Sequence, residues 1–193
     1  LVTSLMTYWY PGIQETIDAV SSVFPATPIV LGGIYARLCE AHAQRNAGAD
    51  EVFVESAEQI ILSVIQRFTG FSTNLKFDPS DLDSYPYPAL DLQTRINYAP
   101  LLTSRGCPFN CAYCASHLLE PRRMLRSADS VVEEISFWHK DHGVTDFVLY
   151  DDAFLVDAER HALPILEKII DTHLPLRFHT PNAIHIRGVS RHT

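Results

Sequence analysis

Two runs of alternating strands and helices constrain this sequence most, because the strands in each are short and rich in apolar residues. In the first run, residues 1–7 and 28–31 are predicted to be buried strands on either side of a helix over residues 12–24. Short apolar strands joined by a crossover helix are typical of a parallel sheet. The first run therefore predicts part of a doubly wound α/β domain.

The first run continues with a helix, a strand and a further helix, over residues 38–46, 51–54 and 57–68. After Gly70 this pattern is lost, and prolines interleave with aspartate and tyrosine. Such a stretch indicates an ordered linker. We therefore expect a first domain over residues 1–69 and a linker over residues 70–97.

The second run predicts a β-α-β-α-β order in a domain over residues 98–193. Ser127 is a suitable cap for a helix that Gly143 ends, and Asp157 is a suitable cap for a second helix that reaches residue 172. The expected strands occupy residues 98–103, 147–150 and 176–178. This order again favours a parallel sheet.

Cys107, Cys111 and Cys114 form a Cys-x-x-x-Cys-x-x-Cys motif directly after a predicted strand. Three of the four cysteines thus lie within eight positions, too close together for a disulfide framework. This spacing indicates a metal site in a reducing compartment, so we expect a cytoplasmic protein. Thiolates are the ligands that iron–sulfur clusters select, and three thiolates would leave the fourth iron of a cube without a protein ligand.

Two other interpretations of the cysteines stay open. His117 lies at Cys-x-x-His spacing from Cys114, so the same loop could form a Cys₃His zinc site in a non-catalytic binding module. The cysteines could also be purely structural. Cys39 lies apart from the motif, where a buried helical cysteine is the expected interpretation.

The motif resembles that of the radical S-adenosylmethionine family, in which it follows the first strand of a partial (β/α) barrel. The resemblance implies a 4Fe-4S cluster on Cys107, Cys111 and Cys114 and an adenine bordered by Tyr113. It also implies that the open iron binds S-adenosylmethionine and transfers one electron to it, which releases methionine and a 5′-deoxyadenosyl radical. An electron donor such as flavodoxin or ferredoxin is then expected as a partner.

Further polar residues end the later strands of the second run. Asp151 and Asp152 follow the second strand, and Asn182 follows the third. Ligand contacts in such folds gather at the carboxyl ends of parallel strands. In cobalamin-associated members of the family a similar Asp-Asp-x-Phe segment ends the second strand, so the resemblance implies that these three residues bind S-adenosylmethionine. A solvated turn or a helix cap is the alternative for each.

The first run resembles the C-terminal half of a cobalamin-binding domain, because it has hydroxyl residues at the end of a strand and a pair of adjacent glycines after the next strand. Ser4, Thr7, Gly32 and Gly33 are the residues that the resemblance implies for cobalamin. Glycines let a phosphate-bearing ligand approach the backbone closely. The order of the two domains is that of cobalamin-dependent radical enzymes, with methyl transfer or a rearrangement as the implied chemistry. A radical enzyme without bound cobalamin is the alternative.

Composition and length limit the partners. The net charge is −8 and the basic residues form no stripe, so a nucleic-acid partner is not expected. No apolar run reaches the roughly 20 residues of a membrane span.

The first residues include no initiator Met, basic region or small-residue cleavage site, so we expect them to be neither a start nor a signal peptide. We expect a chain that begins within a domain and ends after about half of the six βα units of the implied barrel. Alone, it is expected to be inactive toward its small-molecule or peptide substrate.

Overall fold

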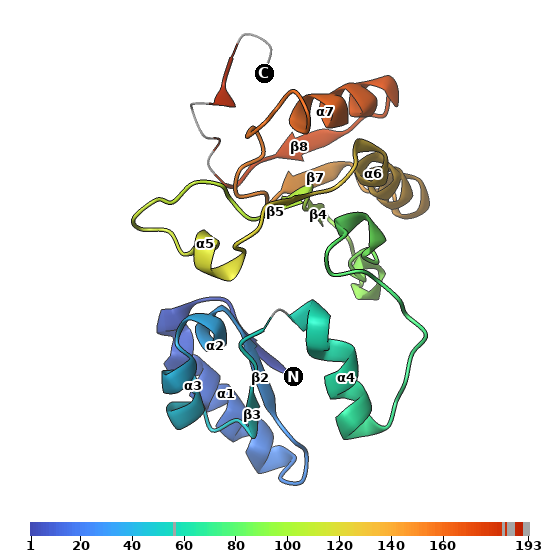
Figure 1. Ribbon diagram of the computed structural model, residues 1–193. Coiled ribbons are helices and arrows are strands. Elements are labelled where there is room, and N and C mark those ends of the chain that lie inside the picture. The colour runs from blue at the N-terminus through green and yellow to red at the C-terminus, as the bar shows by residue number, and fades with distance from the viewer. Residues whose placement is uncertain (56, 183, 185–187, 191–193) are drawn as a thin grey trace. The chain divides into compact units, whose positions relative to one another are not determined.

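The structure is a computed structural model that describes residues 1–55, 57–182, 184 and 188–190. The chain folds into two compact units, Leu1–Lys76 and Phe77–Thr193 (Figure 1). Each unit contains a parallel β-sheet with helices packed on it. The predicted α/β class with parallel sheets is therefore confirmed.

The first unit contains a three-stranded parallel sheet ordered β1-β2-β3. Its strands are β1 (Val2–Ser4), β2 (Val30–Gly33) and β3 (Glu51–Val52). The short 3-10 helix η1 (Thr7–Trp9) and helix α1 (Tyr10–Val23) connect β1 to β2. The fully buried Ile17 of α1 packs in one cluster with Leu31 of β2. The crossover helix thus covers the sheet as the apolar pattern predicts.

The predicted helix over residues 38–46 is wrong at its start. Two helices occupy this region, α2 (Ile34–Leu38) and α3 (Glu40–Asn46), and the non-helical backbone of Cys39 separates them. Helix α2 begins directly after β2, because Tyr35 and Ala36 are buried in the core of the unit. Helix α4 (Ala57–Thr69) ends the unit close to the predicted bounds.

The second unit contains a three-stranded parallel sheet ordered β4-β7-β8. Its strands are β4 (Ala99–Leu101), β7 (Asp146–Leu149) and β8 (Arg177–His179). Helices α6 (Ala128–His142) and α7 (Ala162–Asp171) lie on the same side of this sheet (Figure 1). Trp138 of α6 and Ile165 of α7 are buried in a common core with Phe147 of β7. The predicted β-α-β-α-β order is confirmed.

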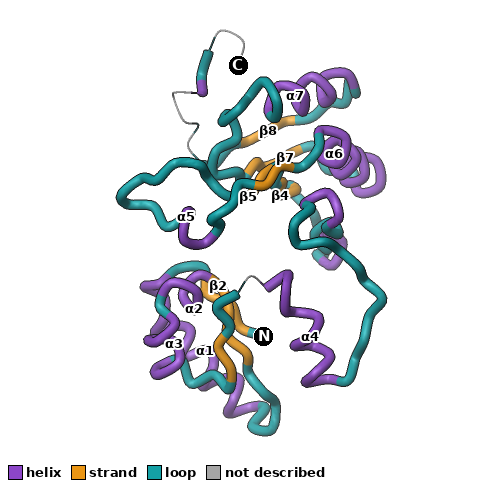
Figure 2. Tube along the Cα trace, viewed as in Figure 1, coloured by secondary structure: helices purple, strands orange, loops and turns teal. Residues whose placement is uncertain are grey.

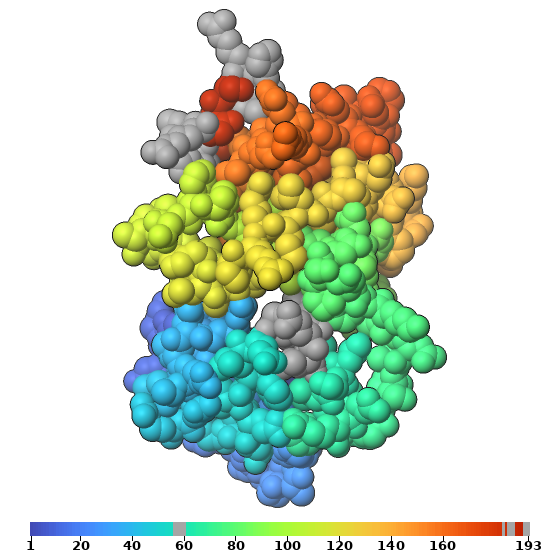
Figure 3. All heavy atoms as spheres, viewed as in Figure 1, coloured from blue at the N-terminus to red at the C-terminus, as the bar shows by residue number. Residues whose placement is uncertain are grey.

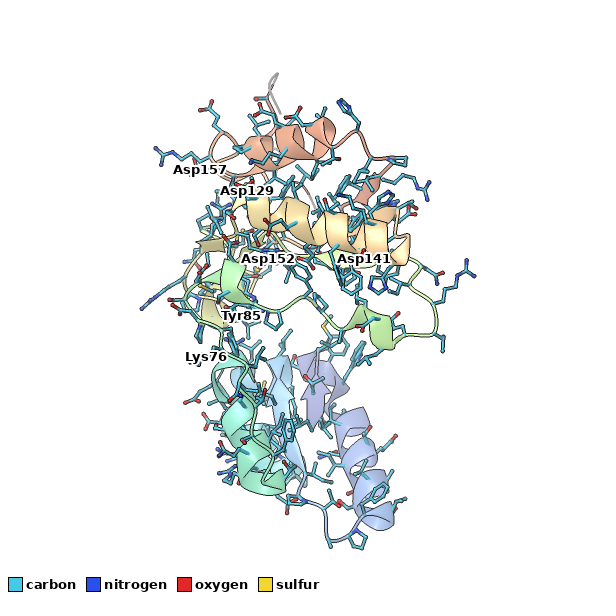
Figure 4. The ribbon with its side chains drawn as sticks, turned by 90° about the vertical axis from the view of Figure 1, so that its right-hand side faces the viewer. Lys76, Tyr85, Asp129, Asp141, Asp152 and Asp157 are labelled. Atoms are coloured by element: carbon cyan, nitrogen blue, oxygen red, sulfur yellow. The ribbon has the colours of Figure 1, made fainter. Side chains whose placement is uncertain are left out.

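The two ends of α6 follow the prediction from the sequence. The Ser127 hydroxyl accepts a hydrogen bond from the backbone N–H of Ser130, and Gly143 has a φ of +70°. These are the expected side-chain N-cap and left-handed C-cap. Figure 4 shows Asp129 and Asp141 at opposite ends of this helix.

The predicted start of α7 at Asp157 is wrong, because the helix begins at Ala162 with His161 as the capping position. Asp157 has a φ of +55°, in the left-handed region, so it turns the chain instead of starting a helix. Its carbonyl oxygen accepts hydrogen bonds from the backbone N–H groups of Arg160 and His161. His161, the residue directly before the helix, is buried.

Part of the proline-rich stretch belongs to the second compact unit. It contains two 3-10 helices, η2 (Leu82–Ser84) and η3 (Leu90–Leu92). Leu90 is buried in the same core as α6 and β7. The Asp83 carboxylate accepts hydrogen bonds from the backbone N–H of Ser127. This stretch therefore packs against α6.

None of the helices in the described ranges combines the length and hydropathy needed to cross a lipid bilayer. The cytoplasmic location stays a prediction.

Candidate functional site

The cysteine loop, residues 106–123, leaves and rejoins the second unit at one short hairpin. Strand β5 (Ser104–Arg105) pairs in antiparallel direction with β6 (Met124–Leu125). Between these strands the loop contains one helical turn, α5 (Ser116–Leu119). Figure 2 shows the loop as a long segment interrupted by that turn. The three cysteines therefore lie on a segment whose two ends are held together.

Gly106 permits the close approach of the two ends. Its φ is +81°, and a Cβ at this position would lie 2.5 Å from the carbonyl oxygen of Arg122 and 3.0 Å from that of Glu120. Both the backbone conformation and the short contacts exclude a side chain. The base of the loop thus requires glycine immediately before Cys107.

Cys107, Cys111 and Cys114 are free thiols with partly buried side chains. The Cys114 sulfur accepts a hydrogen bond of 3.4 Å from the backbone N–H of Ser116. The Cys114 N–H donates to the Cys111 carbonyl at 3.0 Å, so the last two cysteines share one turn. Within the part of the chain that the structure describes, no three His, Cys, Asp or Glu side chains are gathered as a metal site requires.

The donor set fits an iron–sulfur cluster by its chemistry. Three thiols on one loop can be deprotonated to the thiolates that such clusters bind, and an N–H donor to a ligand sulfur stabilises the thiolate. In Figure 3 the yellow-green and yellow atoms of the loop form part of the molecular surface. His117, the fourth ligand of the zinc alternative, is exposed on α5.

Asp151 lies at the base of the loop and is buried, with 4% of its surface exposed. Its Oδ1 accepts hydrogen bonds from the Thr103 hydroxyl at 2.8 Å and from the Ser104 hydroxyl at 2.6 Å. The Thr103 backbone N–H lies 3.2 Å from both carboxylate oxygens. Such donors offset the cost of removing a carboxylate from water. The predicted contact of Asp151 with a ligand stays a prediction.

His161 completes this buried network. Its Nε2 lies 2.8 Å from the Thr103 hydroxyl, whose single proton is donated to Asp151. The hydroxyl oxygen must then accept the second bond, so Nε2 carries a proton. Burial lowers the pKa of His161 below its ordinary value, although the nearby Asp151 carboxylate acts in the opposite direction. His161 therefore donates from Nε2 to the Thr103 hydroxyl, and its burial disfavours the charged form of the ring.

The other residues predicted for S-adenosylmethionine differ in their surroundings. Tyr113 is 93% exposed, and Asp152 is exposed too. The Asn182 amide donates hydrogen bonds to the backbone carbonyls of Tyr150 at 2.9 Å and Asp151 at 3.3 Å. Asn182 thus contacts the end of β7, and the two aspartates share that end. The ligand roles of these residues stay predictions.

In the first unit, the residues predicted for cobalamin lie near the ends of β1 and β2. The Ser4 side chain is buried and its hydroxyl donates to the Met6 carbonyl at 2.9 Å, whereas Thr7 is half-buried in η1. Gly33 has a φ of +89°, and a Cβ there would lie 2.5 Å from the Ser4 carbonyl oxygen. A Cβ on Gly32 would meet nothing within 4 Å. Gly33 therefore serves strand packing, while Gly32 borders open space.

That open space is a cavity of about 250 Å³ beside the sheet of the first unit. Thr3, Gly32 and Gly33 line it from the first two strands, and Phe53 and Glu55 line it from the segment after β3. Both predicted glycines thus border a cavity. Neither Ser4 nor Thr7 lines it.

A larger cavity, of about 320 Å³, lies beside β4 in the second unit. Tyr85, Tyr87 and Tyr150 line it together with Arg105 and Arg126. The three cysteines do not line this cavity, so its size alone does not mark it as the reactive site.

Three residues at the base of the loop were missed by the sequence reasoning: Thr103, Ser104 and His161. The Arg123 side chain donates to the Val156 carbonyl at 2.8 Å, which is a contact over 33 positions. Thr103 and His161 are 58 positions apart. The one available signal was that Thr103 ends one predicted strand and Asp151 follows the next, and adjacent parallel strands end at the same edge.

The curated relatives match parts of the chain. An uncharacterised methyltransferase of Pyrococcus horikoshii is 34% identical over 88 residues, which cover 42% of this chain and 19% of the relative. The anaerobic magnesium-protoporphyrin IX monomethyl ester cyclase of Cereibacter sphaeroides is 24% identical, with 84% of this chain and 31% of the relative covered. The cytidylyl-2-hydroxyethylphosphonate methyltransferase of Streptomyces wedmorensis is 26% identical, with 55% and 23% covered. The chain thus spans less than a third of each relative. No family model matches the sequence.

A solved structure matches most of the chain. It is the radical S-adenosylmethionine methyltransferase TsrM from Kitasatospora setae, with cobalamin and a 4Fe-4S cluster bound. The TM-score is 0.62 at 16% sequence identity, and the match covers 92% of this chain and 42% of that chain. At this identity the likeness shows a shared fold.

Proposed function

We propose that this chain belongs to the radical S-adenosylmethionine enzymes that carry a cobalamin-binding domain, and that it contributes a 4Fe-4S site for cleavage of S-adenosylmethionine. One observation carries the proposal. The Cys-x-x-x-Cys-x-x-Cys motif lies on a loop that follows the first strand of a parallel sheet and is closed at its base by β5 and β6. When bound, such a cluster supplies the electron that splits S-adenosylmethionine into methionine and a 5′-deoxyadenosyl radical.

The residues of the chain have distinct roles in this proposal. Cys107, Cys111 and Cys114 hold the cluster and leave one iron open for the amino and carboxylate groups of S-adenosylmethionine. The exposed ring of Tyr113 is available to border the adenine, and the exposed carboxylate of Asp152 is available to the amino group. Asn182 acts mainly by holding the backbone end of β7, where Asp151 and Asp152 follow.

Cobalamin is proposed as the second cofactor, bound by the first unit. The support is the cavity at Gly32, where the backbone is open to a ligand and no Cβ occupies the space. In the domain division that we propose, residues 1–69 are part of a cobalamin-binding domain, residues 70–97 are a linker and residues 98–193 begin the barrel. Ser4 and Thr7 are also proposed to contact cobalamin in this domain.

Methyl transfer is the reaction that we favour for the whole protein, because two relatives and the solved structure are described as methyltransferases. A rearrangement is the other candidate. We further propose a cytoplasmic enzyme with an electron donor such as flavodoxin or ferredoxin. The chain covers 42% of TsrM, so the isolated chain is expected to bind its cofactors without turning over a substrate.

Anaerobic reconstitution of the chain with iron and sulfide tests the cluster. We expect about four irons and four sulfides per chain, and a paramagnetic signal of the reduced cluster that changes when S-adenosylmethionine is added. Stoichiometric zinc without iron uptake would contradict the proposal and favour a zinc-stabilised binding module. Co-elution of added cobalamin, with a shift of its visible spectrum, tests the second cofactor separately.

A further inference from the structure

The segment after β7 contacts both ends of the cysteine loop. At the first end, Asp151 accepts hydrogen bonds from Thr103 and Ser104, which lie four and three positions before Cys107. At the second end, the Arg123 guanidinium donates to the carbonyl of Val156 at 2.8 Å. The residues that carry the thiols lie between these two contacts. Both ends of the segment that carries the thiols are therefore held by residues that follow β7.

Asp151 gives the first end several charge-assisted contacts. Its carboxylate accepts hydrogen bonds from two hydroxyls and a backbone N–H, and such bonds are worth more than those between neutral groups. The Ser104 hydroxyl bond, at 2.6 Å, is short. Ser104 also begins β5, the strand that pairs with β6 to close the loop. A single carboxylate thus fixes both the end of β4 and the start of the closing hairpin.

We infer that Asp151 is a positioning residue, which presents the three cysteines by holding Thr103 and Ser104 and acts without being a ligand itself. This inference rests on the function proposed above. Burial supports it, because only 4% of the Asp151 surface is exposed and its oxygens already accept bonds from the protein. His161 supports the same arrangement by donating to the Thr103 hydroxyl. Asp152, the exposed neighbour, is left as the carboxylate available to a ligand.

Amide hydrogen exchange on the full chain tests this role, measured before and after anaerobic reconstitution. In Asp151→Asn, we expect the amides of residues 104–125 to exchange about tenfold faster than in the wild type, since a charge-assisted contact is lost. The amides of α6 should keep their wild-type rates. Glu159→Gln is the matched control, because it neutralises an exposed carboxylate in the same region and should leave the loop unchanged.

A second readout follows the cluster itself. In the reconstituted protein, Asp151→Asn should release iron to a chelator about tenfold faster, and S-adenosylmethionine should change its paramagnetic signal less than in the wild type. Glu159→Gln should match the wild type in both measurements. A variant that merely lowered global stability would accelerate exchange in α6 as well.

If Asp151→Asn does not fold, Ser104→Ala tests the same inference. This variant removes one hydrogen-bond donor to Asp151, and the carboxylate keeps the donors of Thr103. A rise of about threefold in loop exchange is expected. Loop exchange equal to that of Glu159→Gln, with α6 intact, would overturn the inference. A wild-type chain that takes up no iron would overturn the proposed function, and the exchange measured before reconstitution would still decide the role of Asp151.

Discussion

The Ser104 hydroxyl donates a hydrogen bond of 2.6 Å to the Asp151 carboxylate, across 47 positions of sequence. The register of the sheet explains how they meet. Leu101 of β4 lies opposite Leu149 of β7, so the residues that follow the two strands emerge at the same edge. The chain therefore places the start of the cysteine loop beside the segment that ends the neighbouring strand.

Replacement of Gly106 should lower the stability of the second unit. In Gly106→Ala, the new Cβ would lie 2.5 Å from the Arg122 carbonyl oxygen in a left-handed backbone, so we expect a loss of roughly 2–4 kcal/mol in the free energy of unfolding. Gly143→Ala is the matched control, since Gly143 has a φ of +70° but open space around it. It should lose about 1 kcal/mol. Equal losses in urea denaturation would show that the contact at Gly106 contributes nothing.

Substitutions of the two neighbouring glycines of the first unit should have different effects, one on stability and the other on cofactor binding. Gly33→Ala should destabilise the first unit, because its Cβ would lie 2.5 Å from the Ser4 carbonyl oxygen. Gly32→Ala meets nothing within 4 Å, so its unfolding free energy should change by no more than about 0.5 kcal/mol. Gly32 lines the cavity, however, so we expect the added methyl group to weaken cobalamin binding in a spectral titration. Unchanged affinity in Gly32→Ala would remove the cavity as the proposed cobalamin site.

Each cysteine of the loop should be needed for the cluster. Cys107→Ser, Cys111→Ser and Cys114→Ser should each retain less than half of the wild-type iron after anaerobic reconstitution, because a hydroxyl is a poor substitute for a thiolate ligand. Cys39→Ser, on the first unit, should retain it all. Iron and sulfide analysis measures this directly. Loss of iron in Cys39→Ser alone would place the cluster elsewhere.

Acid should destabilise the second unit through His161. Burial lowers its pKa in the folded chain below the ordinary value of 6.5, so the unfolded chain binds more protons between these two values. The free energy of unfolding should therefore fall as the pH falls below about 6.5, and level off below the lowered pKa. His161→Gln, which keeps a donor for Thr103, should show a flatter pH profile. The exposed His173, replaced by asparagine, should leave the slope unchanged.

Local signals in the sequence were sufficient for the regular helices and for the parallel sheets. Ser127 and Gly143 bound α6 as predicted, since side-chain capping and a left-handed glycine depend on a few adjacent residues. The start of α7 was wrong because Asp157 is a good cap by residue type, yet its backbone is left-handed and the helix begins only at Ala162. The position at which α7 begins therefore depends on tertiary contacts and not on local residue preference alone.

The candidate site was predictable only in part for the same reason. The spacing of Cys107, Cys111 and Cys114 is visible in the sequence, and so is the position of Asp151 after a strand. The β5 and β6 pairing was not, because strands of two residues carry no periodic pattern. Nor does any sequence pattern distinguish the buried Asp151 from the exposed Asp152, which differ only in their partners from distant segments.

Because the base of the cysteine loop is closed, the length of this loop is not coupled to the arrangement of the parallel sheet. Because β5 and β6 meet beneath it, residues 107–122 begin and end at nearly the same point in space. A change in the length of such a segment adds little entropic cost and does not alter the distance between β4 and α6. Loops of other lengths could therefore be grafted between Gly106 and Arg123 while the parallel sheet beneath kept its register.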